Sequence, residues 1–201
     1  DEAFTEYGLL AETIEWPDDR SWVSFTLRNE AYWHDGKKIT ADDVVWTFNT
    51  LMEKGHPFYK YYYGDVKEVI KEQENKVRFN FTTNTNKELV LIVGQLPVLP
   101  KHYWENKNFE ETSLEIPIGS GPYKIKSFDS GRSITYELDQ NYWGFDASIP
   151  IKIGKDNFGI IRYDYYKDRG IEREAFKSGE IDFFSENSSK EWATAYDIKA
   201  V

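Results

Sequence analysis

The feature that most constrains the fold is a turn followed by an alternating strand at residues 117–128, Pro-Ile-Gly-Ser-Gly-Pro-Tyr-Lys-Ile-Lys-Ser-Phe. Two glycines and two prolines in six residues favour a tight turn over a helix or a strand. From residue 123 the side chains alternate between two faces, although Phe128 falls on the face of the lysines. Residues 131–133, Gly-Arg-Ser, then predict a hairpin tip, and residues 134–138 predict the returning strand.

The composition limits the classes of partner. The chain has 201 residues and a net charge of −10, with 25 basic and 35 acidic residues. A nucleic-acid binder or a protein that docks on anionic lipid needs clustered Lys and Arg, so we expect neither. Cysteine is absent, which excludes structural disulfides, Cys-based zinc sites and thiol catalysis. The longest apolar run, residues 89–99, is interrupted and too short to span a bilayer, so we expect no membrane insertion within this chain.

The rest of the chain predicts strands and helices without strict alternation, which favours α+β, or α/β with insertions. We predict strands at residues 22–28, 66–71, 77–82, 160–166 and 181–184. We predict helices at residues 40–55, 87–93, 101–105 and 171–177, and a further helix start at Ser188. Thr40 and Asp43 form the capping box of the first helix. Residues 7–11 predict a short helix or turn, and residues 57–63 predict an aromatic loop.

No pattern identifies a catalytic or metal site. His34, His56 and His102 lie far apart in sequence and lack the spacing of paired metal ligands. Ser120 lacks the G-x-S-x-G pattern of a nucleophile, so we interpret it as a small residue in a tight turn. Carboxylate pairs are frequent, but they are expected on the surface of an acidic chain. We therefore predict no catalytic residue, no metal and no cofactor.

Aromatic residues are the remaining signal. The chain holds 14 Tyr, 13 Phe and 7 Trp, and most of these rings must be in the core. Residues 57–63 contain five rings, which cannot all point inward from one short loop. This segment predicts an aromatic surface that faces a ligand or an interface.

Four blocks in a fixed order resemble one protein family. The blocks are residues 25–28 with 33–48, residues 99–104, residues 119–144 and residues 174–183. They resemble the extracellular solute-binding proteins of peptide-importing ABC transporters, known as family 5. Within that family, residues 7–12 and 162–166 are most similar to binding proteins of oligopeptide importers that also take up microcin C-type peptides.

The resemblance implies an architecture. It implies part of a periplasmic-binding-protein type II clamshell, with the first lobe and its inserted subdomain present and the second lobe absent, because family members are more than twice this size. Residues 1–115 would form the inserted subdomain and the edge of lobe I. Residues 116–187 would form the mixed sheet of lobe I, and residues 188–201 the start of the crossover toward the second lobe.

The resemblance also implies a function without catalysis. Such a protein captures oligopeptides or peptide conjugates in the periplasm, or outside a cell to which an upstream segment anchors it, and delivers them to an ABC permease. The ligand-binding residues that family geometry implies are Tyr7, Tyr61, Tyr62, Tyr63, Ser185, Glu186 and Asn187. Their alternative roles are ordinary: core packing for Tyr7, and a polar strand end and helix cap for residues 185–187.

Two other functions stay open at this point. An envelope hydrolase would use carboxylates in an aromatic cleft, and it needs an acid–base pair with perturbed pKa values. A glycan-binding module would use exposed rings as a platform.

Overall fold

The computed structural model describes residues 5–145, 149 and 152–196. The chain forms two compact units, which are described separately. Unit 1 comprises Asp1–Lys124 and Glu137–Gly159, and unit 2 comprises Ile125–Tyr136 and Ile160–Val201. Both units contain helices and strands, so the predicted mixture of the two is confirmed.

Unit 1 is built on an antiparallel sheet of four strands in the order β1-β2-β4-β3. The strands are β1 (Ala11–Glu15), β2 (Trp22–Leu27), β3 (Val66–Gln73) and β4 (Lys76–Phe81). In β4 every second residue is buried, namely Val77, Phe79 and Phe81. This period of two places one face of the sheet in the core and leaves the other polar.

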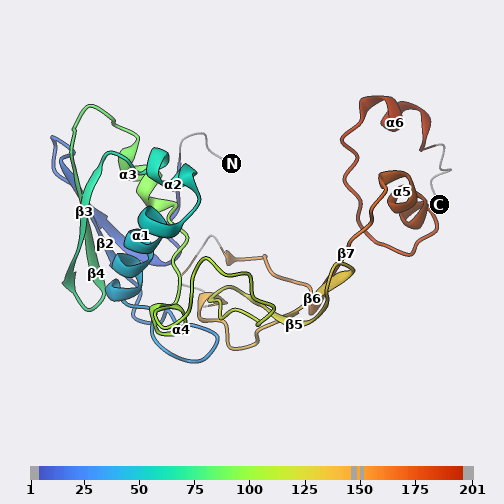
Figure 1. The fold of residues 1–201 in the computed structure, drawn as a ribbon, viewed down its shortest axis with the longest axis horizontal. Coiled ribbons are helices and arrows are strands. Elements are labelled where there is room, and N and C mark those ends of the chain that lie inside the picture. Colours follow the sequence, from blue (N-terminus) through green and yellow to red (C-terminus); the bar gives the residue numbers. More distant parts are fainter. Residues whose placement is uncertain (1–4, 146–148, 150–151, 197–201) are drawn as a thin grey trace. The chain divides into compact units, whose positions relative to one another are not determined.

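Four helices belong to unit 1: α1 (Ala41–Lys54), α2 (Pro57–Tyr62), α3 (Leu89–Gly94) and α4 (Lys101–Trp104). In α1 the side chains of Val44, Phe48 and Leu51 are buried, at the spacing of one helix face. They belong to the same core cluster as Val23 and Phe79 of the sheet. Figure 1 shows α1, α2 and α3 gathered on one side of this sheet.

The predicted capping box starts α1 and also holds α4. The main-chain N–H of Thr40 donates to Asp43 Oδ2 at 2.9 Å, and the N–H of Lys101, the first residue of α4, donates to Asp43 Oδ1 at 2.8 Å. Asp43 is only 4% exposed. A carboxylate tolerates such burial because backbone donors replace the water that it loses.

The stretch at residues 117–128 is a turn whose carbonyl groups are engaged by distant residues. The carbonyl of residue 119 accepts a hydrogen bond from the main-chain N–H of His34 at 2.8 Å. The carbonyl of residue 121 accepts one from the ring Nε2 of His34, also at 2.8 Å. The carbonyl of residue 120 accepts from the indole of Trp143 at 3.0 Å, and that of residue 122 from the N–H of Asp139 at 2.8 Å. A Cβ at Gly119 would lie 3.1 Å from the His34 ring, a tight contact that favours glycine at this position.

The predicted strand and its return follow this turn. Strands β5 (Tyr123–Asp129), β6 (Ser133–Leu138) and β7 (Ile160–Asp164) form a sheet in the order β5-β6-β7. Gly131 has a φ of 72° at the hairpin tip, a conformation that glycine adopts without strain. A 3-10 helix, η1 (Trp143–Phe145), lies between β6 and β7 in sequence.

Unit 2 contains α5 (Arg169–Lys177) and α6 (Ser189–Thr194). The predicted start of α6 is confirmed, because the Ser188 side chain accepts a hydrogen bond from the N–H of Glu191 at 3.3 Å. Asp168 caps α5 in the same way, accepting from the N–H groups of residues 170 and 171.

One strand was not predicted, and two predicted elements are wrong. Residues 11–15 form β1, where we expected a turn or helix ending at residue 11 and no strand. Residues 57–62 form α2 and not a loop: Pro57 stands at its first position, and the His56 ring accepts from the N–H of Phe58 at 3.1 Å. Residues 181–184 form no strand, because no described strand of unit 2 pairs with them.

The double role of Asp43 predicts a large loss of stability on truncation. Asp43→Ala removes the carboxylate of the capping box of α1 and leaves the Lys101 N–H without its partner, so we expect the free energy of unfolding to fall by about 2–4 kcal/mol. The matched control is Asp42→Ala, which removes a surface ion pair with Lys71 and should cost less than about 1 kcal/mol. Urea unfolding followed by tryptophan fluorescence measures both. Equal losses in the two variants would contradict the assigned role.

Candidate ligand-binding site

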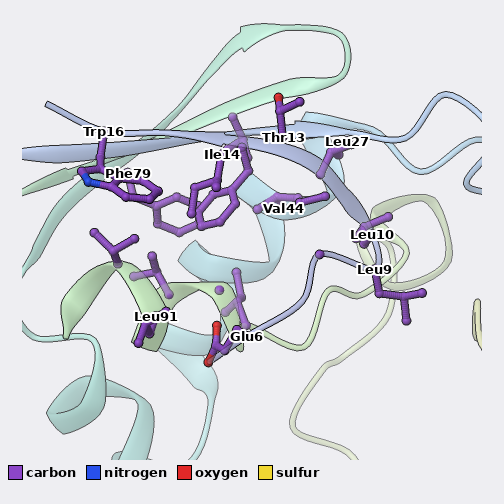
Figure 2. Close-up of a pocket in the computed structure, with 18 of the residues that line it drawn as sticks. Glu6, Leu9, Leu10, Thr13, Ile14, Trp16, Leu27, Val44, Phe79 and Leu91 are labelled. Carbon is purple, nitrogen blue, oxygen red and sulfur yellow. The ribbon is translucent and has the colours of Figure 1, made fainter. Parts of the chain in front are cut away.

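An apolar groove of about 580 Å³ lies within unit 1, between β1 and α3. One wall is β1 with the segment before it, and the other wall is α3 with its flanking residues. The floor is formed by core side chains of the sheet and of α1, including Phe25, Phe79 and Val44. Figure 2 shows Ile14 of β1 and Trp16, which directly follows this strand, above this space and Leu91 of α3 below it. We call it the β1–α3 groove; its volume is that of small-molecule sites.

The two ends of the groove carry opposite charges. Arg20 Nη1 donates to the carbonyl of Lys87 at 2.7 Å, just before α3 begins. At the other end Glu6 Oε1 accepts from the side chain of Gln95 at 2.7 Å, where α3 ends. The groove is therefore an apolar trough with a cationic and an anionic end.

The predicted ligand-binding tyrosines of unit 1 do not come together at this groove. Tyr7 lines it and is 59% exposed. Tyr61, Tyr62 and Tyr63 lie at the end of α2 and are not among the lining residues. Tyr61 is 89% exposed, so it is available to a ligand, and Tyr62 is half-buried, stacked on Phe58.

Tyr63 has the core role that we expected of most aromatic rings. It is 2% exposed and packs against the rings of Tyr59 and Phe48. Burial raises its pKa to about 12, and the neighbouring Tyr62 and Tyr59 add to the shift. The structure places this ring in the core of unit 1, where a ligand does not reach it.

The three candidates of unit 2 are placed differently from one another. Glu186 is an internal link: its carboxylate accepts from the Ser188 N–H at 2.9 Å and from the Tyr196 hydroxyl at 2.8 Å. Its side chain is 5% exposed and faces Arg173. The Ser188 N–H and the Tyr196 hydroxyl, with the charge of Arg173, lower the pKa of Glu186. Ser185 and Asn187 are exposed and remain candidates for ligand contact.

The described residues give little support to acid–base or metal chemistry. The carboxyl pKa shifts that are resolved there are all downward, at Asp19, Asp35, Glu72, Glu115 and Glu186. A general acid in a hydrolase needs the opposite shift. Within the described ranges, no group of three or more His, Asp or Glu side chains is placed to hold a metal ion. In the same ranges no helix has the length and apolar character needed to cross a membrane.

Comparison with known proteins now identifies the family. Residues 5–201 match the sequence model of bacterial extracellular solute-binding proteins, family 5 Middle. The chain belongs to this family. The resemblance seen in the four sequence blocks is therefore confirmed.

Two relatives and one solved structure show the extent of the similarity. The chain is 40% identical, over its whole length, to the probable peptide-binding protein YejA of Agrobacterium fabrum, of which it covers 33%. It is 41% identical to the peptidoglycan-binding protein YepA of the same organism, of which it covers 34%. The oligopeptide-binding protein AppA of Bacillus subtilis, solved with a nonapeptide, matches 94% of the chain with a TM-score of 0.71 and 25% identity. The match covers 36% of AppA.

These matches confirm the mixed fold of family 5 binding proteins, and the chain spans about a third of the length of the relatives that it matches. The assignment of residues 1–115, 116–187 and 188–201 to the inserted subdomain, the lobe I sheet and the crossover stays a prediction.

Sequence reasoning missed the β1–α3 groove, because it missed β1. A signal was present: Leu10, Ile14 and Trp16 fall on alternate positions of residues 10–16, as the apolar residues on one face of a strand do. Glu12 interrupts this pattern, because it falls on the same face as the three apolar residues. The approach of α3 to β1 depends on tertiary packing and carries no local signal.

The contrast between Tyr63 and Tyr61 predicts unequal stability effects. Tyr63→Ala opens a cavity beside Phe48 and Tyr59, so the free energy of unfolding should fall by about 3–5 kcal/mol. Tyr61→Ala removes an exposed ring and should change it by no more than about 0.5 kcal/mol. Chemical denaturation measures both variants. A similar loss in both would show that the α2 rings act as one packed cluster.

The lowered pKa of Glu186 predicts a pH dependence. A carboxylate with a lowered folded-state pKa stabilises the fold above its unfolded pKa, near 4.5, and this contribution is lost as the pH falls. We therefore expect Glu186→Gln to be less stable than the native chain near neutral pH, with the difference shrinking between about pH 5 and pH 3. Thermal unfolding at several pH values measures this difference. A difference that does not change with pH would contradict the ionic role.

Proposed function

We propose that this chain is part of the solute-binding component of an ABC importer that captures short peptides or peptide conjugates outside the cytoplasm. The observation that carries the proposal is the match to family 5 over residues 5–201, together with 40% identity to a probable peptide-binding protein across the whole chain. In this role the protein releases its ligand unchanged to a membrane permease. The compartment is the periplasm, or the cell exterior where the protein is anchored.

The proposal assigns binding without turnover. The family consists of solute-binding proteins, and the resolved carboxyl pKa shifts run against a general acid. Tyr7, Tyr61 and Tyr62 in unit 1, and Ser185 and Asn187 in unit 2, are the exposed or half-buried residues that we propose for ligand contact. Glu186 would act on the ligand indirectly, by holding residues 185–188 in place.

Peptides from the bacterial cell wall are a second candidate ligand. The relative YepA, 41% identical to this chain, is named a peptidoglycan-binding protein. Peptidoglycan carries short peptides on a glycan, so both candidates share peptide chemistry. They differ in whether the sugar is needed for binding.

Calorimetric titration of the chain tests the proposal with three ligand pools: mixed tri- to pentapeptides, peptidoglycan fragments and neutral oligosaccharides. We expect heat from the peptide pool, with a dissociation constant of roughly 0.1–1 mM, since the chain spans about a third of the length of its relatives. Heat from peptidoglycan fragments alone would replace the first candidate by the second. Heat from oligosaccharides alone, or from none of the pools, would overturn the peptide assignment.

A further inference from the structure

We propose that the β1–α3 groove binds an extended apolar peptide by strand addition to β1. The peptide would form a fifth strand on the free edge of the four-stranded sheet and place alternate side chains on the apolar floor. This inference rests on the proposed peptide ligand, and it adds a site that lies wholly within unit 1.

One edge of β1 faces away from β2 and has no partner strand among the described residues. In the sheet order β1-β2-β4-β3, this strand is terminal and pairs with β2 alone among the described residues. An edge strand presents main-chain N–H and C=O groups that need partners, and an extended peptide supplies them without regard to its side chains. Four of the five residues of β1 are exposed.

The wall of the groove opposite β1 is apolar. Helix α3 presents Val90, Leu91 and Val93 to the groove, and the floor adds Phe25 and Phe79. Figure 2 shows this arrangement, with β1 on one side, α3 on the other and apolar side chains between them. A strand laid beside β1 would point every second side chain into this space. A groove between an edge strand and a helix thus offers both backbone pairing and apolar pockets.

The two ends of the groove carry opposite charges. Arg20, in the connection between β1 and β2, and Lys87, just before α3, both line this end of the groove. Glu6 lies where α3 ends, and Glu12 lies near the start of β1. These charges suit a peptide that runs parallel to β1, with its amine toward Glu6 and its carboxylate toward Arg20 and Lys87.

Arg20 supports this polarity. Its φ is 53°, a left-handed conformation that is unfavourable for a residue other than glycine. This backbone turns the chain from β1 into β2, and the side chain reaches the carbonyl of Lys87 across the groove end. Glycine would relieve the strain but would remove the cation.

The length of β1 sets the length of the ligand. Its five residues extend for about 16 Å at the usual rise of a strand. A peptide of about four or five residues fills this edge from the anionic to the cationic end. The test ligand is therefore an alternating pentapeptide of alanine and leucine with free ends, compared with the same peptide amidated at its C-terminus.

The experiment is calorimetric titration of the whole chain and of three variants at low salt. Leu91→Trp fills the groove and should abolish measurable binding. Lys87→Gln should weaken the free-acid peptide about two- to fivefold and leave the amidated peptide unchanged, because only the carboxylate loses its partner. Lys155→Gln, an exposed lysine outside the groove, is the matched control and should change neither affinity.

The outcomes separate this inference from the proposed function. Loss of binding in Leu91→Trp, with the selective effect of Lys87→Gln, supports strand addition in the stated direction. If Leu91→Trp fails to fold, the comparison of Lys87→Gln with Lys155→Gln still decides the matter. Peptide binding that neither groove variant weakens would overturn the inference and leave the proposed function standing. Absence of peptide binding by the native chain would overturn both.

Discussion

The turn at residues 119–122 is the constraint on which much of unit 1 depends. Its consecutive carbonyl groups accept hydrogen bonds from His34, Trp143 and Asp139, which lie far apart in the sequence. Buried carbonyl groups need such partners, so the turn joins the start of the chain to the segment after β6. Glycine suits position 119 because a Cβ there would lie only 3.1 Å from the His34 ring.

The β1–α3 groove follows from the way in which the sheet of unit 1 is covered. One face is polar: Glu72 accepts from Ser24 and pairs with Arg78, contacts that lower its pKa. All apolar cover must therefore lie on the other face. Helix α1 covers its centre with 14 residues, whereas α3 has only six and ends at Gly94. The short helix leaves the floor beside β1 open, and the free edge of β1 makes that opening suitable for a peptide.

Local signals predicted the parts of the fold that local interactions decide. The capping box at Thr40, the helix start at Ser188 and the strand after the turn at residues 119–122 depend on neighbouring residues, and all three are confirmed. Residues 57–62 misled the prediction, because a run of aromatic residues hid a helix that starts at Pro57. The strand β1 left a signal that was missed, whereas the approach of α3 to β1, which forms the groove, depends on tertiary packing and left none. The family, by contrast, was evident from four blocks in order, which no single motif would have shown.

Hydrogen exchange of the main-chain amides in β1, with and without the alternating pentapeptide, tests the central claim most directly. Strand addition would give the outward-facing amides of residues 11–15 a hydrogen-bond partner. The account predicts that their exchange slows on peptide binding, together with that of amides in α3 that the ligand shields. Bound peptide with unchanged exchange in β1 would contradict the account, because the ligand would then lie at another surface.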